Sequence, residues 1–559
     1  MQRRTFIQVS TALTGLSLLA PACKPARRSI PGEIVGASSA IGHLLRDGKL
    51  GTSGQQPAKP GAPMSQSPRD GKTGSPLNGK TCRVAIIGGG ISGLSAARWL
   101  KLHGVDDICV LDLERHVGGN AASGQNAVSA YPWGAHYIPT PNNPLREYLQ
   151  FLEEANVITG YDPKGLPVYN DYFLCFDPQE RLYLHGNWQT DLIPRLGLPE
   201  TDHTEITRFL HQMEQFRSAK GSDQLDAFTI PIDTSSKDPQ YTVLDTITMA
   251  NWLQKNGYTS SYLKWYVNYC MRDDFGTPAE LISAWTGIHY FASRKGRGSN
   301  AQHYDVLTWP QGNGWLVEQL CRPIGDKLKP NALAIKIDPS PEKLEVQYYD
   351  VTTREVKAIW PEQIIIATPQ FIANRLLPVS EERQRIVKQE MHYTPWMVAN
   401  LTVGNLEERS GVPLSWDNVV YDSESLGYVE ATHQQVQQLK EKKVLTYYWP
   451  LTAQEPVKAR EWAAQRTHAQ WVSDIVADLK KVHPDIETQT ERIDIMVWGH
   501  AMAQPRPGWI HGGDRQMLQQ SFDGRIHFAH TDLAGISIFE EGFYQGIRAA
   551  EKVLQGGRT

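Results

Sequence analysis

Hydrophobic positions and glycines form the clearest structural pattern of the chain near residue 85. Residues 83–88 read RVAIIG, an apolar run rich in β-branched residues, which predicts a strand buried on both faces of a parallel sheet. Apolar residues then recur at helical spacing over residues 92–104, which end on a glycine, so this segment predicts a helix. Residues 107–112 predict a second strand. The order strand, helix, strand is typical of a βαβ unit.

Later segments extend this α/β pattern. Residues 333–369 predict strands joined by a turn, and residues 308–320 predict a glycine-containing turn followed by a helix. Residues 455–486 predict one long helix that stops at His483-Pro484. Residues 524–554 predict a last strand and a final helix. The segments between these regions are long enough to form a second domain, as expected for a chain of 559 residues.

The glycines between the first strand and the first helix have the spacing of a dinucleotide-binding loop. In the pattern G-x-G-x-x-G, the first glycine permits a tight turn, the second lets the backbone approach a pyrophosphate, and the third lets helix and strand pack closely. The N-terminus of the helix favours phosphate through its free N–H groups and its dipole. A carboxylate at the end of the second strand can bind ribose hydroxyls. We therefore predict that a dinucleotide is bound by Gly88, Gly90, Ser92, Gly93 and Asp112.

The residues after Asp112 narrow the choice of dinucleotide. Residues 113–123 read LERHVGGNAAS, and this resembles the flavin-containing amine oxidase and phytoene desaturase superfamily, in which the loop after Val-Gly-Gly wraps FAD. The resemblance implies FAD as the cofactor and adds Gly118, Gly119 and Asn120 to the residues expected to bind it. Asn120 stands where an arginine is common in the superfamily. A direct charge contact to phosphate is therefore missing there or supplied elsewhere.

A second resemblance lies at the C-terminal end, in GRIHFAHTDLAGISIFEEGFYQGIRAAEKVL. The superfamily has Phe-Ala-Gly and an acid at this place, followed by a helix with glycines at spacing four; here His530 replaces the glycine and Asp532 is the acid. The resemblance implies that Asp532 contacts the ribityl chain or a phosphate. It also implies that the N-terminus of the last helix faces the flavin pyrimidine. The likeness spans residues 83–554 and is firm at its two ends.

The fold class implied is α/β, with a doubly wound, Rossmann-like FAD-binding domain and an interleaved α+β substrate domain. The expected FAD-binding domain comprises residues 80–145, 301–370 and 490–555, and the expected substrate domain comprises residues 146–300 and 371–489. Many of the chain's tryptophans and tyrosines fall in the second set, where aromatic walls would suit an apolar or cationic substrate.

Residues 1–22 have the features of an export signal. Arg3 and Arg4 precede an apolar stretch that ends on a small-x-small triplet, which resembles a twin-arginine signal; an ordinary export signal is the alternative. The export machinery is then a partner, and the expected location is periplasmic or exported. Because the twin-arginine route carries folded proteins, such a signal suits a protein that binds its cofactor before export.

The segment after the signal has a different composition. Residues 23–79 are rich in Pro, Gly, Ser and Lys and are expected to form a linker or a surface wrap. Within it, residues 34–48 carry enough apolar side chains to dock on the main body. Cys23 directly follows the small-x-small triplet and is a candidate for lipid attachment, which would be the link to a membrane.

Charge and composition exclude several functions. The net charge is −4, so no basic surplus points to nucleic acid, and no apolar run reaches the roughly 20 residues of a membrane span. The six cysteines lack metal-ligand spacing, and no metal site is expected. Motifs of hydrolases, metalloproteases and nucleoside triphosphatases are also missing from the sequence.

Three histidines are candidates for a catalytic role. His136 lies in YPWGAHYIP, a glycine-containing segment that passes near the flavin ring in the resembled superfamily. His289 follows the run Arg272-Asp273-Asp274, for which a structural salt-bridge role is the favoured interpretation, and His500 lies shortly before the expected flavin-binding turn. The sequence offers no clear aromatic pair to flank a substrate nitrogen, which weakens an amine oxidase assignment.

The leading hypothesis is an exported FAD-dependent oxidoreductase in which an amine-like or apolar small molecule passes a hydride to flavin N5. A flavin desaturase or isomerase acting on an apolar substrate is the alternative enzyme. A non-catalytic or electron-relay flavoprotein of the cell envelope is a further alternative, and so is a binding module without FAD. The sequence does not choose among amines, amino acids and unsaturated lipid-like molecules.

Overall fold

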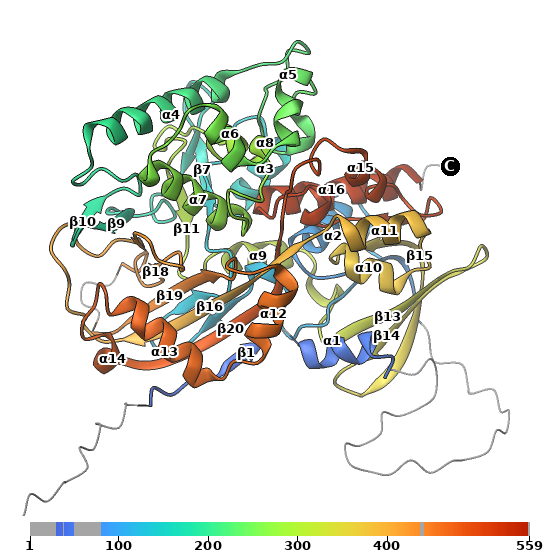
Figure 1. The fold of residues 1–559 in the computed structure, drawn as a ribbon. Coiled ribbons are helices and arrows are strands. Elements are labelled where there is room, and N and C mark those ends of the chain that lie inside the picture. Colours follow the sequence, from blue (N-terminus) through green and yellow to red (C-terminus); the bar gives the residue numbers. More distant parts are fainter. Residues whose placement is uncertain (1–28, 37, 50–79, 437–440, 557–559) are drawn as a thin grey trace, which may run out of the picture.

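The computed structural model describes residues 29–36, 38–49, 80–436 and 441–556. Its main features are a seven-stranded sheet and an eight-stranded sheet with helices packed on both, and Figure 1 shows the two sheets at the right and at the left of the molecule. The predicted fold class is confirmed: a Rossmann-like unit is combined with a second, mixed sheet. No helix in the described ranges is long and apolar enough to cross a membrane.

The seven-stranded sheet contains the predicted βαβ unit. Its order is β12-β3-β2-β15-β14-β13, with β21 beside β15. Five of its strands run parallel: β12 (Leu328–Lys329), β3 (Ile108–Leu111), β2 (Lys80–Ile87), β15 (Glu355–Ile366) and β21 (Ile526–Phe528). An antiparallel extension is added by β13 (Ala332–Pro339) and β14 (Leu344–Asp350). The strand β3 is apolar along its whole length, and β2 and β15 end in apolar runs, because both faces of the sheet are covered there.

Two long helices from opposite ends of the chain cross on this sheet. The helix α2 (Ile91–Leu102) buries its apolar residues, and α16 (Phe539–Gly556) packs against it. The close crossing depends on Gly546, because a Cβ at this position would lie 2.2 Å from the Ser92 carbonyl oxygen. Chain ends that are far apart in sequence therefore meet at the glycine loop.

The eight-stranded sheet has the order β1-β20-β16-β19-β18-β17-β9-β10. Its strands are β1 (Ile34–Gly36), β20 (Thr490–Ala503), β16 (Tyr393–Val403), β19 (Lys443–Pro450), β18 (Tyr428–Glu430), β17 (Asp417–Val420), β9 (Glu180–Leu184) and β10 (Asn187–Thr190). Alternate residues of β16 point to opposite faces, so Met397, Ala399 and Leu401 pack with Trp471 on one side while Trp396 and Val398 line a cavity on the other.

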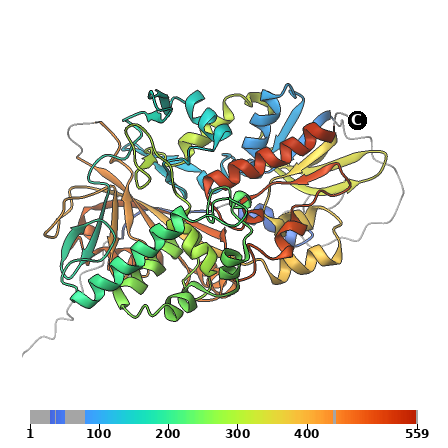
Figure 2. The ribbon, with the colours of Figure 1, turned by 90° about the horizontal axis from the view of Figure 1, so that it is seen from above.

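Helices between residues 200 and 292 form a layer on the cavity side of the eight-stranded sheet. These are α4 (Glu200–Ser218), α6 (Met249–Lys255), α7 (Ser261–Phe275) and α8 (Ala284–Ala292). Phe209, Trp252, Trp285 and Phe291 from these helices belong to one large buried cluster. Figure 2 shows the layer, in green, on the side of the molecule that carries the eight-stranded sheet.

A short N-terminal segment contacts both sheets, and we call its described residues, 29–36 and 38–49, the strap. Its strand β1 pairs in parallel with β20, Ile34 opposite Ile495. Its helix α1 (Ser39–Arg46) follows, and the Ser38 backbone N–H and hydroxyl both donate to the Glu114 carboxylate at 2.8 Å. Ile41 and Leu45 pack with Leu333 of β13. Residues 34–36 and 38–48 thus dock on the main body, as the apolar content of residues 34–48 indicated.

Two features differ from the sequence analysis. The helix expected over residues 455–486 is divided into α12 (Pro456–Ala464) and α13 (His468–Leu479), because Thr467 and Gln470 form a reciprocal capping box that starts a new helix. Residues 490–503 were assigned to the FAD-binding domain, but as β20 they pair with β16 in the eight-stranded sheet.

The predicted export signal, the candidate lipid site Cys23 and most of residues 23–79 lie outside the described residues.

Candidate functional site

Three cavities follow one another from the glycine loop to the helical layer. The glycine-loop cavity encloses about 1020 Å³, the middle cavity about 820 Å³ and the distal cavity about 1410 Å³, each counting the open space at its mouth. The glycine-loop and middle cavities share Asn120, Ala135, Ala501, Ser537, Ile538 and Phe539. The middle and distal cavities share His136, Tyr137, Pro139, Asp273, Arg294 and Tyr448. The three cavities therefore adjoin one another and share walls.

The glycine loop has the geometry that its spacing predicted. Gly88 has a φ of +107°, and a Cβ there would lie 2.6 Å from the Ala367 carbonyl oxygen. A Cβ on Gly93 would lie 1.9 Å from the Gly88 carbonyl oxygen, whereas a Cβ on Gly90 would meet nothing within 4 Å. Gly88 and Gly93 thus permit close packing within the protein, while Gly90 leaves its space to a ligand in the cavity.

Asp112 lies at the end of β3 and lines the glycine-loop cavity. Its Oδ2 accepts the Gly89 backbone N–H at 2.5 Å and its Oδ1 accepts the Glu114 backbone N–H at 2.7 Å. Burial raises the pKa of this carboxyl to about 6, although the two backbone donors oppose the shift. Asp112 therefore organises the loop and keeps remaining acceptor capacity for a ligand hydroxyl.

The other predicted cofactor-binding residues also reach this cavity. Gly118 forms a bridge with Gly90, and Gly119 and Asn120 follow it along the cavity wall. The Asn120 side chain donates to the Ala501 carbonyl oxygen, so it connects two parts of the wall. Ser92 lies in the first turn of α2, where no acidic residue and no side-chain cap occupies the helix N-terminus. The helix end is thus open to an anion.

Asp532 is fully buried and also belongs to the lining of the glycine-loop cavity. Its Oδ2 accepts the Gln370 backbone N–H and the Tyr393 hydroxyl, both at 2.8 Å, and its Oδ1 lies 3.0 Å from Nδ1 of His530. Burial alone would raise the pKa of Asp532, but His530 and the two donors outweigh it and hold the pKa below its ordinary value. Oδ2 of this buried carboxylate is thus engaged inside the protein, whereas Oδ1 has no hydrogen-bond partner among the described residues.

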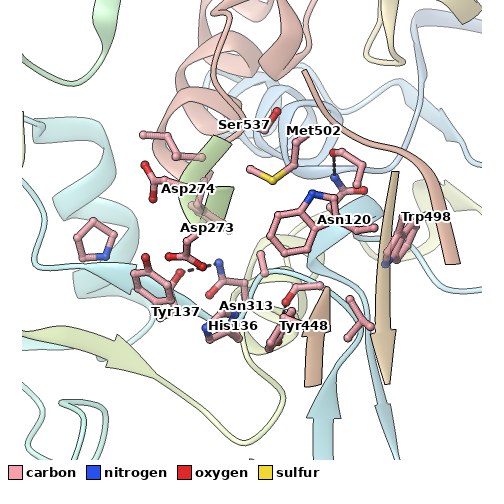
Figure 3. A pocket seen from close by; sticks show the side chains of 18 of the residues that line it. Asn120, His136, Tyr137, Asp273, Asp274, Asn313, Tyr448, Trp498, Met502 and Ser537 are labelled. Carbon is pink, nitrogen blue, oxygen red and sulfur yellow. Dashed lines mark hydrogen bonds between the residues drawn. The ribbon is translucent and has the colours of Figure 1, made fainter. Parts of the chain in front are cut away.

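Aromatic and apolar side chains form the walls of the middle cavity. Trp396 of β16, Tyr448 of β19 and Trp498 of β20 come from the inner face of the eight-stranded sheet, and Met502 and Phe539 close the wall toward the glycine loop. Figure 3 shows Asp273 and Tyr137 on one side of this cavity and Asn120 and Trp498 on the other. A flat aromatic ligand could lie between these walls.

Carboxyl groups meet where the middle cavity passes into the distal one. Asp274 is paired with Arg294, whereas the Asp273 side chain forms no hydrogen bond or ion pair with any residue of the described chain. Asp417 and Glu180 begin the neighbouring strands β17 and β9, lie opposite each other in register, and line the distal cavity. Burial and the neighbouring Asp274 raise the pKa of Asp273 to about 7, and burial and the neighbouring Asp191 raise the pKa of Glu180 to about 7.

Glu540 adds a further acid at the start of α16. It is 1% exposed, lines the middle cavity, and its Oε2 has no hydrogen-bond partner within the part of the chain that the structure describes. Burial raises its pKa to about 7. The sequence analysis expected only the positive end of the helix dipole at this place, and the structure adds a carboxyl group to it.

The three candidate histidines have different positions. His136 lies between the middle and distal cavities and stacks on Tyr448 with ring centroids 4.6 Å apart. His500 lines the glycine-loop cavity beside Phe371. His289 lines none of the three cavities; its Nε2 lies 2.9 Å from the Thr229 carbonyl oxygen and its ring stacks on Trp285. Burial lowers the pKa of His136 and of His289 to about 3, so both are neutral.

Sequence reasoning missed Asp417, Glu180, Glu540, Trp396 and Tyr448. The two acids start strands that are remote in sequence and meet only in the sheet, so no local motif marks them. Asp273 was noticed, but within a run for which a structural role was favoured. The signal available for Glu540 was its place in the first turn of the C-terminal helix next to the expected flavin-binding turn.

Comparisons with known proteins agree with this architecture. Residues 86–152 match the family model described as NAD(P)-binding Rossmann-like domain. A flavin-containing amine oxidase of Oncorhynchus mykiss is 24% identical over 330 residues, 56% of this chain and 55% of that protein. Polyamine oxidase 7 of Oryza sativa is 34% identical over 98 residues, 17% of this chain and 21% of that protein. The chain thus spans about half the length of the amine oxidases it matches.

Solved structures show the same fold over most of the chain. A double mutant of putrescine oxidase has a TM-score of 0.63 at 14% identity and covers 85% of this chain and 99% of its own. Cyclohexylamine oxidase from Brevibacterium oxydans has a TM-score of 0.61 at 15% identity, covering 86% and 100%. A fatty acid isomerase from P. acnes has a TM-score of 0.58 at 14% identity, covering 84% and 98%.

Proposed function

We propose that this chain, a member of the flavin-containing amine oxidase superfamily, is an FAD-dependent oxidoreductase whose substrate is a small amine. One observation carries the proposal: the cavity at the glycine loop adjoins an aromatic-walled cavity, which ends at the Asp273 carboxyl group, and this group forms no ion pair within the described chain. The first part suits a dinucleotide, the second a flat ring system and the third a cation.

The residues present fit FAD. The open space at Gly90, the uncapped N-terminus of α2 and the acceptor Asp112 lie together in the glycine-loop cavity, as a dinucleotide requires. The middle cavity offers apolar and aromatic walls on the side away from the glycine loop. Cavities that bind ligands commonly measure about 300–1,000 Å³, so the two together give room for an extended cofactor. When bound, FAD accepts a hydride from the substrate carbon at flavin N5.

The chain's own residues favour a cationic substrate. Asp273 is aimed at the boundary of the middle and distal cavities and has no partner within the described chain, so an ammonium group would satisfy it. His136 and Tyr448 stack next to it and present aromatic faces to a cation. Burial and the neighbouring Asp274 raise the pKa of Asp273 to about 7. The Asp273 carboxylate can therefore also hold a proton that the substrate releases.

The test is an anaerobic reduction experiment on the purified protein. We expect a visible flavin absorption band at about 450 nm. This band is expected to bleach when at least one amine, from a panel of primary and secondary amines, reduces the flavin. Asp273→Asn is expected to raise KM for that amine roughly tenfold or more, since a charged hydrogen bond is lost, while the flavin band stays unchanged.

Other outcomes would contradict the proposal in distinct ways. Bleaching by unsaturated lipid-like molecules alone would favour a desaturase or isomerase. A flavin band that no donor on the panel bleaches would favour an electron-relay protein. A colourless protein that takes up no FAD would leave only a binding module.

The proposal includes export to the periplasm. It is supported by Arg3 and Arg4 before an apolar stretch and by the small-x-small triplet that precedes Cys23. The signal belongs to a class that carries folded proteins, which suits an enzyme that acquires FAD in the cytoplasm. Lipid attachment at Cys23 would anchor the enzyme to the membrane.

A further inference from the structure

The turn that follows β3 carries Asp112, the carboxylate that we assign to the dinucleotide. Its Oδ2 accepts the Gly89 backbone N–H at 2.5 Å, and its Oδ1 accepts the Glu114 backbone N–H at 2.7 Å. An aspartate that accepts the N–H two residues ahead forms an Asx-turn, which fixes the side chain against its own backbone. The direction in which the Asp112 carboxylate points therefore depends on the position of Glu114.

Glu114 is held through its backbone and through its side chain by different segments. Its carbonyl oxygen accepts the backbone N–H of Asn331 at 3.2 Å, next to the first residue of β13. Its two carboxylate oxygens accept the backbone N–H and the hydroxyl of Ser38, each at 2.8 Å. Ser38 belongs to the strap and is the N-cap residue of α1, where the helix dipole favours a negative charge. The strap therefore holds the Glu114 side chain.

The strap also packs on the residue between Asp112 and Glu114. A Cβ on Gly42 of α1 would lie 3.7 Å from Cδ2 of Leu113, an ordinary van der Waals distance. Leu113 belongs with Ile41 and Leu45 of α1 to the apolar side chains around Leu333, Ile335 and Tyr349. Figure 1 shows α1 beside β13, at the edge of the molecule where β1 joins β20. The strap thus contacts both residues that follow Asp112.

The other end of the strap is attached to the eight-stranded sheet. The Ile493 backbone N–H donates to the Pro31 carbonyl oxygen at 3.0 Å, and Ile34 pairs with Ile495 in the parallel ladder of β1 and β20. Ile30 is 5% exposed and belongs to the apolar cluster on that sheet. Because the strap has this second attachment, it can restrain the turn after β3 from outside the seven-stranded sheet.

We propose that the strap is a positioning element for the dinucleotide: Ser38 holds Glu114, and Glu114 fixes the direction of the Asp112 carboxylate. The inference rests on the proposed function, because it presumes FAD in the glycine-loop cavity. Ser38 and Glu114 are positioning residues, since neither of them lines that cavity. An N-terminal segment outside the βαβ unit thus contributes to the affinity for the cofactor.

The experiment measures the dissociation constant of FAD by flavin fluorescence on the full chain. We expect roughly fivefold weaker binding in Glu114→Ala, the effect of about one net hydrogen bond. Glu114→Gln keeps an acceptor for the Ser38 N–H and an amide group for its hydroxyl, so it is expected to bind FAD nearly as well as wild type. Asp494→Ala is the matched control, because Asp494 of β20 accepts another N–H of the strap, that of Glu33 at 3.2 Å. This control is expected to bind FAD as wild type does.

A double-mutant cycle distinguishes positioning of Asp112 from a general effect on the fold. Asp112→Ala removes the carboxylate itself, so adding Glu114→Ala to it is expected to weaken FAD binding no further. A further loss in the double variant would overturn the inference. Unchanged FAD binding in Glu114→Ala, no gain in Glu114→Gln over Glu114→Ala, or an equal loss in Asp494→Ala would also overturn it, while FAD binding by the wild type stands. A wild-type protein that binds no FAD would overturn the proposed function instead.

Discussion

At the scale of single residues, the protonation of the Glu540 carboxyl group makes the charge of the site depend on pH. Its side chain is 1% exposed at the start of α16, and one of its oxygens lacks a partner among the described residues. Burial raises its pKa from 4.5 to about 7, even though Arg294 nearby favours the charged form. At neutral pH the group is therefore partly protonated and can donate a hydrogen bond into the middle cavity.

The pH dependence of stability follows from this shift. Between about pH 4.5 and pH 7 the folded chain holds the Glu540 proton while the unfolded chain releases it, so the free energy of unfolding falls as pH rises through that window. Glu540→Gln removes the effect. We expect the variant to equal wild type near pH 5 and to be more stable by about 1–3 kcal/mol near pH 8, measured by denaturant titration.

Glu461→Gln, on the exposed face of α12, is the matched control and should follow the wild-type curve at both pH values. A variant Glu540→Gln that loses stability equally at both pH values would show that Glu540 acts through packing and not through its proton.

At the scale of elements, the βαβ unit separates two uses of glycine. Gly93 lets α2 approach the strand, because a Cβ would collide with the Gly88 carbonyl oxygen at 1.9 Å. Gly90 caps α2 with an extended backbone that any residue can adopt, φ −76° and ψ −177°, and faces open space. Gly93 therefore serves the packing of the fold, whereas Gly90 leaves space for the proposed ligand.

This difference predicts opposite behaviour of two alanine variants. Gly93→Ala is expected to lower the midpoint of thermal unfolding strongly or to prevent folding, since overpacking of this kind costs roughly 1–3 kcal/mol or more. Gly90→Ala is expected to keep the circular dichroism spectrum and to lose FAD, because its methyl group would occupy the cavity. Each variant serves as the control for the other, and retention of FAD by Gly90→Ala would contradict the assignment of the cavity.

At the scale of the molecule, the strap connects the two sheets to the N-terminal segment for which we propose an export signal. Ile30 is buried with Trp471 under the eight-stranded sheet, and α1 contacts the seven-stranded sheet. Seven residues, 23–29, separate the expected cleavage site from Ile30. Fully extended, they reach at most about 25 Å, so a lipid on Cys23 would keep the folded body close to the membrane.

Export can be tested with paired substitutions of arginine by lysine. Arg3→Lys with Arg4→Lys is expected to leave full-length, flavin-containing protein in the cytoplasm, because the arginine pair is what the export machinery reads. Arg27→Lys with Arg28→Lys changes a second arginine pair outside the signal and is expected to be exported normally. Cell fractionation with immunoblotting measures both, and equal export of the two variants would contradict the twin-arginine assignment.

Part of the fold could be predicted from the sequence because it depends on residues that are close to one another along the chain. The glycine spacing, the acid at Asp112 and the apolar runs on either side predicted the βαβ unit, and the structure confirms it. The division of α12 from α13 was also encoded locally, in Thr467 and Gln470, but the helical periodicity on both sides concealed it. Local signals therefore predicted the type of element better than its boundaries.

The sequence by itself determined the Rossmann-like unit, since the requirement for a tight turn, a close backbone approach and a buried strand is met within thirty consecutive residues. Only the tertiary structure decided which acids face the site. Asp273, Glu180, Asp417 and Glu540 come from separate helices and strands, and folding brings their carboxyl groups to the walls of two adjoining cavities. Burial and electrostatic coupling between distant segments exist only once the chain is folded, and they set the charge of this site.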